Sequence, residues 1–104
     1  MSKAQVKKII KKYTETLIEN GLPVKGTYLF GSHALGKSNK WSDIDVAVVV
    51  DENKANFWKK LSLYSKIGLA VDRRLEAHIF STLDFKNDSD PMVFEIKRTG
   101  LRVV

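Results

Sequence analysis

The segment Tyr28–Val50, YLFGSHALGKSNKWSDIDVAVVV, contains the features that decide the fold of this chain. It begins with a short apolar run that stops at Gly31, and it ends with the β-branched run Val46–Val50. Runs of this kind are typical of buried strands. A glycine at the turn permits backbone angles that other residues avoid and allows another group to approach the main chain closely. The segment therefore predicts two strands joined by a turn and a polar loop.

Two aspartates, Asp43 and Asp45, lie at the start of the second predicted strand. Successive strand side chains point to opposite faces, so the two carboxylates share one face while Ile44 points into the core. Neighbouring carboxylates repel each other and are unfavourable to bury unpaired. A hard divalent cation, which prefers oxygen ligands, resolves that conflict.

Each of these features has an ordinary structural explanation when it occurs alone. An Asp-x-Asp at a strand start is commonly a solvated edge, and a Gly-Ser pair is commonly a loop. Here ten residues separate Ser32 from Asp43, and the two features follow two predicted strands. This combination favours a functional site over two unrelated turns.

The pair Gly31-Ser32, the ten-residue gap and Asp43-Ile44-Asp45 resemble the signature of the DNA polymerase beta-type nucleotidyltransferase superfamily. The similarity is closest to its small members, the minimal nucleotidyltransferases (MNT domains). The resemblance implies a nucleotidyltransferase fold and the transfer of a nucleotidyl group from ATP or another nucleoside triphosphate to an acceptor. It also implies two Mg²⁺ ions held by three acidic residues, of which Asp43 and Asp45 would be two. Leu35 stands where family members often have arginine.

The third acidic residue is expected on a neighbouring strand, which the pattern places at residues 73–81. Glu76 is flanked there by apolar residues, as the resemblance requires, and we expect it to be a metal ligand or general base. Asp72, nearer the start of the strand, is a weaker candidate. The structural alternative for Glu76 is a salt bridge with Arg74 or a lysine. His78, two residues beyond Glu76, is expected to be a half-buried strand residue, and the less favoured alternative is a residue that supports the metal ligands.

The loop between the two strands supplies the remaining candidates. The resemblance and the turn chemistry together predict nucleotide binding by Gly31, Ser32, Ser42 and Lys37. The structural alternatives are a turn role for Ser42 and a solvated side chain for Lys37. His33 is expected on the loop surface, because a hard cation prefers carboxylates, and Trp41 is expected to pack under the loop.

Helical periodicity predicts helices over residues 3–20 and 55–69, with a third over residues 92–99. The face predicted for the second helix includes Phe57, Tyr64 and Gly68, with Trp58 and Leu69 beside them. Together with strands at residues 24–30, 43–50 and 73–81, these elements predict an α/β fold in which a small mixed sheet is flanked by helices in two layers or a sandwich. We expect residues 1–104 to form a single domain.

Composition restricts the classes of function. The chain carries a net charge of +6 and contains no cysteine, which excludes disulfides and thiolate metal sites. No apolar run is long enough to span a membrane and no secretory signal is evident, so the expected compartment is the cytoplasm. The basic charge suits a polyanion, but the lysines and arginines are scattered, and nucleic-acid binding is possible without being favoured.

Small members of the resembled family include antitoxins encoded beside a helical HEPN-type toxin, and some transfer AMP to a tyrosine of that partner. The resemblance therefore implies an antitoxin role with a HEPN-type partner. Two other hypotheses remain open at the level of sequence. One is a catalytically decayed antitoxin that binds its partner by contact alone, with Leu35 as a sign of decay. The other is a basic nucleic-acid-binding domain.

Overall fold

The computed structural model describes all residues, 1–104, and it contains helices interspersed with four strands. They are α1 (Lys3–Glu19), β1 (Val24–Phe30), α2 (Ser32–Leu35), β2 (Ile44–Val50), α3 (Lys54–Val71), β3 (Leu75–Ser81), the 3₁₀ helix η1 (Asp84–Lys86), α4 (Pro91–Thr99) and β4 (Leu101–Arg102). The predicted strand at residues 24–30 is confirmed, and the other predicted elements differ from these bounds by one or two residues at their ends. None of the helices combines the length and the apolar character that a membrane crossing requires.

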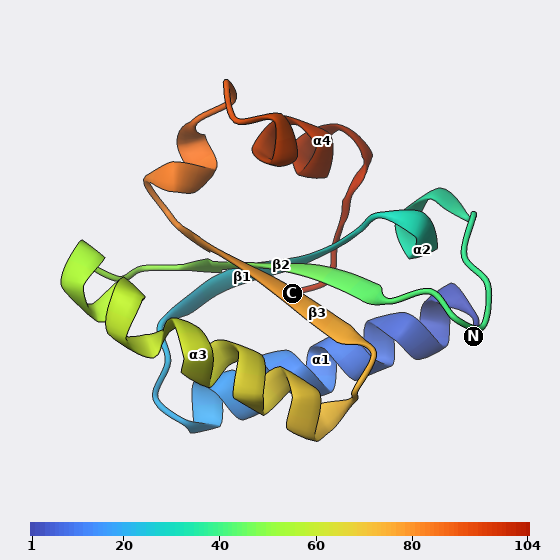
Figure 1. Cartoon of the computed structure of the whole chain (residues 1–104), viewed down its shortest axis with the longest axis horizontal. Helices are drawn as coiled ribbons and strands as arrows, with labels where there is room; N and C mark the ends of the chain where they lie inside the picture. The colour runs from blue at the N-terminus through green and yellow to red at the C-terminus, as the bar shows by residue number, and fades with distance from the viewer.

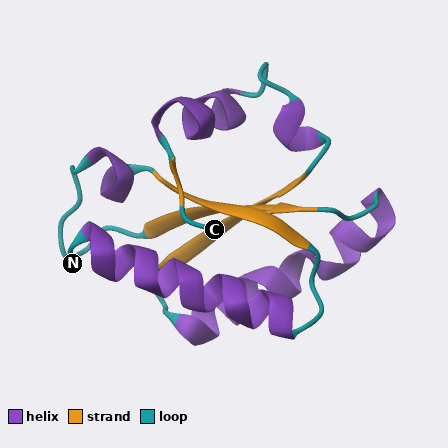
Figure 2. Cartoon of the chain, turned by 180° about the vertical axis from the view of Figure 1, so that it is seen from behind, coloured by secondary structure: helices purple, strands orange, loops and turns teal.

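A four-stranded mixed sheet in the order β3-β2-β1-β4 forms the centre of the molecule. β1 pairs antiparallel with β2 and with β4, whereas β2 and β3 are parallel. α1 and α3 cover one face of the sheet, and α4 with η1 lies on the other (Figure 1). Figure 2 shows the same layers from behind, with α1 running beneath the strands. This arrangement confirms the predicted α/β fold with a small mixed sheet and flanking helices.

The larger core lies between the sheet and the helices α1 and α3. Strand residues of one parity point into it: Leu29 from β1, alternate residues of β2 from Ile44 to Val50, and Leu75 from β3. α1 contributes one apolar stripe at helical spacing, consisting of Val6, Ile10, Tyr13 and Leu17. The alternation that fills this core sends the intervening strand residues to the opposite face.

The face covered by α4 is only partly apolar. Ala47 and Val49 of β2 are buried there, as are Val93 and Ile96 of α4. Asp45 precedes these residues on the same face of β2, and its side chain keeps 25% of its exposure. The end of this face nearest the start of β2 is therefore polar and partly open to solvent.

The expectations for four individual side chains were wrong. Trp41 does not pack under the loop: it is 81% exposed, with the Lys40 ammonium 5.0 Å from the centre of its ring. His33 is buried within α2 instead of lying on the loop surface. Trp58 and Leu69 are exposed because α3 contacts the core with a narrower stripe, in which only Tyr64 and Gly68 are fully covered.

Two buried tyrosines join α1 to α3 and differ in how their hydroxyl groups are satisfied. The Tyr13 hydroxyl donates a hydrogen bond of 2.8 Å to the backbone carbonyl of Tyr64. The Tyr64 hydroxyl is buried without a hydrogen-bond partner. Burial, and secondarily the nearby Glu52 charge, raise the pKa of Tyr64 to about 12. Both hydroxyls therefore stay neutral across the physiological range, and only Tyr13 gains a bond.

We predict opposite results for removing these two hydroxyls. Tyr13→Phe removes the hydrogen bond that the Tyr64 carbonyl accepts from across the helix pair and should lower the free energy of unfolding by about 1 kcal/mol. Tyr64→Phe removes a buried hydroxyl that has no partner, so it should leave the free energy of unfolding unchanged or raise it. Urea denaturation of the two matched variants measures both values, and equal losses would contradict the assignment.

Candidate active site

Asp45 and Glu76 lie side by side where β2 and β3 begin. The parallel register pairs Asp45 with Glu76, and both side chains point to the face that carries α4. The Glu76 side chain is 54% exposed. Loss of water around its carboxylate raises the pKa of Glu76, and the charges of Asp45 and Asp43 raise it further, whereas His78 opposes them. The fold thus holds two carboxylates together against their mutual repulsion.

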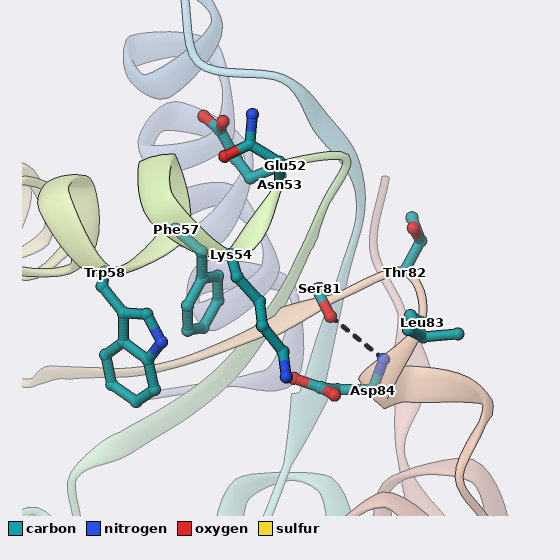
Figure 3. A pocket seen from close by; sticks show the side chains of 9 residues that line it. All are labelled: Glu52, Asn53, Lys54, Phe57, Trp58, Ser81, Thr82, Leu83 and Asp84. Atoms are coloured by element: carbon teal, nitrogen blue, oxygen red, sulfur yellow. Dashed lines mark hydrogen bonds between the residues drawn. The ribbon is translucent and has the colours of Figure 1, made fainter.

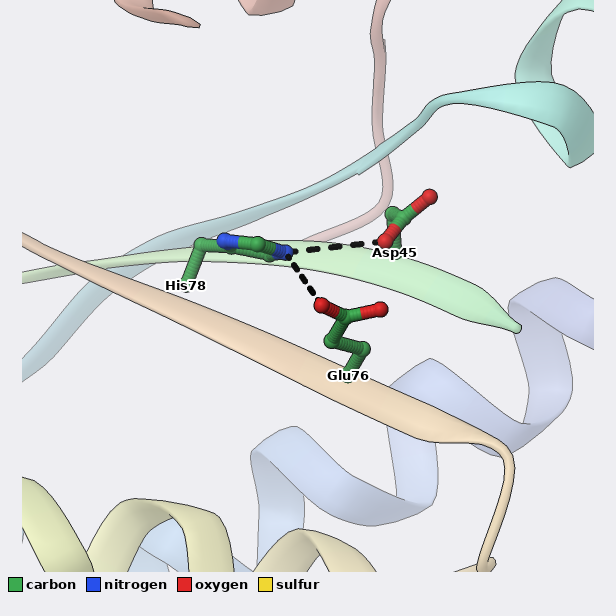
Figure 4. Close-up of side chains that lie close together, drawn as sticks. All are labelled: Asp45, Glu76 and His78. Carbon is green, nitrogen blue, oxygen red and sulfur yellow. Dashed lines mark ion pairs between the residues drawn. The ribbon is translucent and has the colours of Figure 1, made fainter.

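His78 joins the two carboxylates from the next position of β3 on the same face. Its Nε2 atom lies 3.5 Å from an oxygen of Asp45 and 3.7 Å from an oxygen of Glu76. Figure 4 shows the ring edge directed toward the two carboxylates, which come from neighbouring strands. Each of the three residues offers one potential ligand atom, and these three atoms all lie within 4.8 Å of one another. These three residues form the single cluster in the chain with the composition and spacing of a metal site.

Gly31 makes room for this cluster at the end of β1. Its backbone has φ 76° and ψ −153°, a region that is essentially restricted to glycine. A Cβ atom at this position would collide with the carboxylate of Asp45. β1 therefore ends in a turn over which Asp45 lies directly, and the sequence expectation of a close approach at this glycine is confirmed.

The turn continues into α2, which begins at Ser32. The carbonyl of Gly31 accepts hydrogen bonds from the amides of Ala34 and Leu35. The nucleotide-binding role predicted for Gly31 and Ser32 stays a prediction, and the turn lies beside Asp45 as that role requires.

The other predicted site residues are further from the cluster. Asp43 is exposed just before β2 and is outside the group of three, although its charge acts on Glu76. The Ser42 hydroxyl accepts a hydrogen bond of 3.0 Å from the amide of Asn39, which orders the loop. The Ser42 carbonyl lies 3.4 Å from Nε2 of the buried His33. Lys37 is exposed and forms no ion pair, so its predicted contact with phosphate stays a prediction.

His78 is the half-buried strand residue that the sequence predicted, but its position beside both carboxylates was only the less favoured alternative. One signal was present in the sequence: His78 is two positions from Glu76, so any strand places both on one face. What the sequence did not contain is the register that brings Asp45 to the same place.

A cavity of about 200 Å³ lies at the other end of β2 and β3, away from Asp45 and Glu76. Figure 3 shows its lining residues, which come from the start of α3 and from the turn after β3, where the Ser81 hydroxyl accepts a hydrogen bond from the amide of Asp84. Glu52, one of its acidic residues, pairs with Lys60 at 2.9 Å. This cavity is separate from the cluster, and no group of potential metal ligands lines it.

Asp72, the weaker candidate for the third acid, belongs to another interaction. Its carboxylate accepts hydrogen bonds from the Arg74 guanidinium at 2.7 and 3.0 Å. That hydrogen bonding, aided by the Arg74 charge, holds the pKa of Asp72 below its usual range. Asp72 thus closes the turn between α3 and β3.

We predict that the pair formed by Asp72 and Arg74 adds a small, pH-dependent increment of stability. Because the pKa of Asp72 is lower in the folded chain than in the unfolded one, its contribution is complete above the unfolded pKa and disappears as pH falls through the folded pKa. Asp72→Asn should therefore be less stable than the wild type near neutral pH and equal to it in strong acid. Unfolding curves across the acid range measure this difference, and a gap that is constant with pH would refute it.

We also predict that Gly31 and Gly36 tolerate alanine differently. Gly36 has φ 71° with open space around it, so Gly36→Ala should lose about 1–2 kcal/mol of stability from the backbone alone. Gly31→Ala meets the Asp45 carboxylate in a less favourable backbone region, and its loss should be greater by about 1–3 kcal/mol. Urea denaturation measures the stability loss of each variant. Equal losses would mean that the Asp45 carboxylate does not need the space that Gly31 leaves by having no side chain.

Comparison with known proteins agrees with this geometry. The sequence profile of the family described as polymerase beta, nucleotidyltransferase, matches residues 5–104. A relative from Methanocaldococcus jannaschii, named "Putative protein adenylyltransferase", is 28% identical over 96 residues, covering 88% of this chain and 95% of the relative.

A solved structure, described as that of a "putative nucleotidyltransferase" from Sulfolobus solfataricus, shares the fold. Its TM-score is 0.65 at 19% identity, and the match covers 81% of this chain and 74% of that one. Because the family profile spans nearly the whole chain, the resemblance drawn from the Gly-Ser and Asp-x-Asp motifs is confirmed. The chain belongs to the polymerase beta nucleotidyltransferase family and is a nucleotidyltransferase.

Proposed function

We propose that this protein transfers a nucleotidyl group, AMP from ATP, to a hydroxyl group of another protein, in a reaction that depends on Mg²⁺. The observation that carries the proposal is the pairing of Asp45 with Glu76 beside the turn at Gly31, in a chain of the nucleotidyltransferase family. The choice of AMP and of a protein acceptor is supported by the relative named as a protein adenylyltransferase.

The donor atoms present suit divalent cations. Two carboxylates are held within reach of one another, the charge of a third carboxylate acts on Glu76, and a buried ring nitrogen beside them has no hydrogen-bond partner. Asp43 and Asp45 would hold two cations, and Glu76 would share the one on the side of the attacking hydroxyl. Bound cations would mask the charge of the triphosphate and increase the nucleophilicity of the hydroxyl.

The chain's own groups would position the reactants. Gly31 and Ser32 would orient the phosphates through the turn that faces Asp45, with Lys37 and Ser42 as further contacts from the loop. Glu76 would take up the proton of the acceptor hydroxyl. The acceptor oxygen would bond to the α-phosphorus as the bond from that phosphorus to the oxygen bridging to the β-phosphate breaks. The products would be the adenylylated acceptor and pyrophosphate.

The acceptor we propose is a tyrosine of a helical HEPN-type toxin in the cytoplasm, which makes this protein the antitoxin. The open position of the cluster supports an acceptor carried by a large partner, because Glu76 is half exposed and Trp41 stands in solvent on the neighbouring loop. A protein acceptor also agrees with the name of the archaeal relative.

The test is transfer of label from ATP to a purified HEPN-type partner in the presence of Mg²⁺. Label at the α-phosphate should appear in the partner, and label at the γ-phosphate should appear only in pyrophosphate. Asp43→Ala and Asp45→Asn should each reduce the rate by at least about 100-fold while leaving the fold intact. Asp51→Ala, which removes an exposed carboxylate just beyond the other end of β2, is the matched control and should keep full activity.

Two results would contradict the proposal. Equal transfer by the wild type and by Asp45→Asn would remove the assigned role of the carboxylates. Tight binding of the partner by the wild type without any transfer of label would instead favour an antitoxin that acts by contact alone.

A further inference from the structure

The position of His78 is unusual for a strand residue on a half-open face. It occupies the position of β3 next to Ala47 in the register, one pair beyond Asp45 and Glu76 on the same face. The Phe30 ring contacts the imidazole edge to face, with ring centres 5.2 Å apart and an angle of 67°. Packing therefore fixes the ring with one nitrogen directed at the two carboxylates (Figure 4).

That nitrogen, Nε2, is fully buried and forms no hydrogen bond. Its distances of 3.5 and 3.7 Å to the nearest carboxylate oxygens exceed those of good hydrogen bonds. A buried polar atom without a partner is unfavourable, and such atoms are uncommon in native proteins. The nitrogen and the carboxylate oxygens converge, and a cation bound by all three would give the nitrogen the partner that it lacks.

A single divalent ion fits the spacing. Ligands at right angles around an ion with bonds of about 2.1 Å are separated by about 3 Å, and opposite ligands by about 4.2 Å. The distances from Nε2 to the oxygens lie between these values, and all three donor atoms lie within 4.8 Å of one another. Small side-chain rotations would bring the nitrogen and the two oxygens to the separation of adjacent ligands.

We propose that His78 is a direct metal ligand together with Asp45 and Glu76, so that this cation site has mixed nitrogen and oxygen donors and prefers Mn²⁺ to Mg²⁺. The inference rests on the proposed function, because it adds His78 to the carboxylates of the same cation site and assigns that site an ion preference. Mg²⁺ strongly favours oxygen ligands, whereas imidazole suits transition metals. Exchange of an oxygen donor for Nε2 therefore weakens the site for Mg²⁺ relative to Mn²⁺.

The direct test is electron paramagnetic resonance of Mn²⁺ bound to the full chain in the presence of a non-hydrolysable ATP analogue. Pulsed measurement detects a ¹⁴N nucleus bound to the ion, so the wild type should show imidazole nitrogen coupling. His78→Ala and His78→Gln should lose that coupling. The signal of free Mn²⁺ also gives the affinity, which should fall by at least about tenfold in both variants.

Two comparisons separate ligation from a structural role of His78. Competition by Mg²⁺ should show that the ratio of Mn²⁺ to Mg²⁺ affinity falls in His78→Gln, because an amide oxygen replaces the nitrogen. Asp51→Ala should keep both the coupling and the ratio. An unchanged ratio in His78→Gln would overturn the proposal, since loss of packing alone weakens both ions alike.

The outcomes also distinguish this inference from the proposed function. Bound Mn²⁺ without nitrogen coupling in the wild type would overturn the role of His78 and leave the transfer reaction intact. Nitrogen coupling in a protein that transfers no AMP would support the role of His78 and overturn the transfer reaction. Absence of Mn²⁺ binding even with the nucleotide analogue present would overturn both.

Discussion

The parallel pairing of β2 with β3 holds the carboxylates of Asp45 and Glu76 beside each other, although their charges repel. The register that places Asp45 opposite Glu76 also places Ile44 and Val46 opposite Leu75 and Ala77, on the face that packs against α1 and α3. Because strand side chains alternate, a slip of one residue would turn Glu76 toward the larger core. Burial of the apolar residues on one face therefore stabilises the register that creates the charged cluster on the other.

β1 completes the site from the other side of β2. Its antiparallel register sets Phe30 opposite Asp45, so the chain leaves the strand at Gly31 in close contact with the Asp45 carboxylate. The Phe30 ring then contacts His78 across the sheet. Three strands thus contribute to one small region, and each contribution follows from strand pairing and parity, with no need for a long ordered loop.

Much of this was predictable from the sequence, and the limits have physical causes. The strand that ends at Gly31 and the shared face of the two aspartates follow from local pattern, and Glu76 stands out as an acid in an apolar strand. The role of His78 depends on Ala47 and Phe30, which are distant in sequence, and pairing register is not encoded locally. Expectations failed in the loop that carries Trp41, where no periodicity constrains side chains. They failed also on α3, whose apolar surface is wider than the core that it covers.

The most direct test of the account is a crystal structure of the protein with Mn²⁺ and a non-hydrolysable ATP analogue, with the ion located by its anomalous scattering. The account predicts an ion within about 2.2 Å of carboxylate oxygens of both Asp45 and Glu76, with the triphosphate over the turn at Gly31. An ion bound elsewhere, with Asp45 and Glu76 left without a ligand and the nucleotide away from that turn, would contradict it.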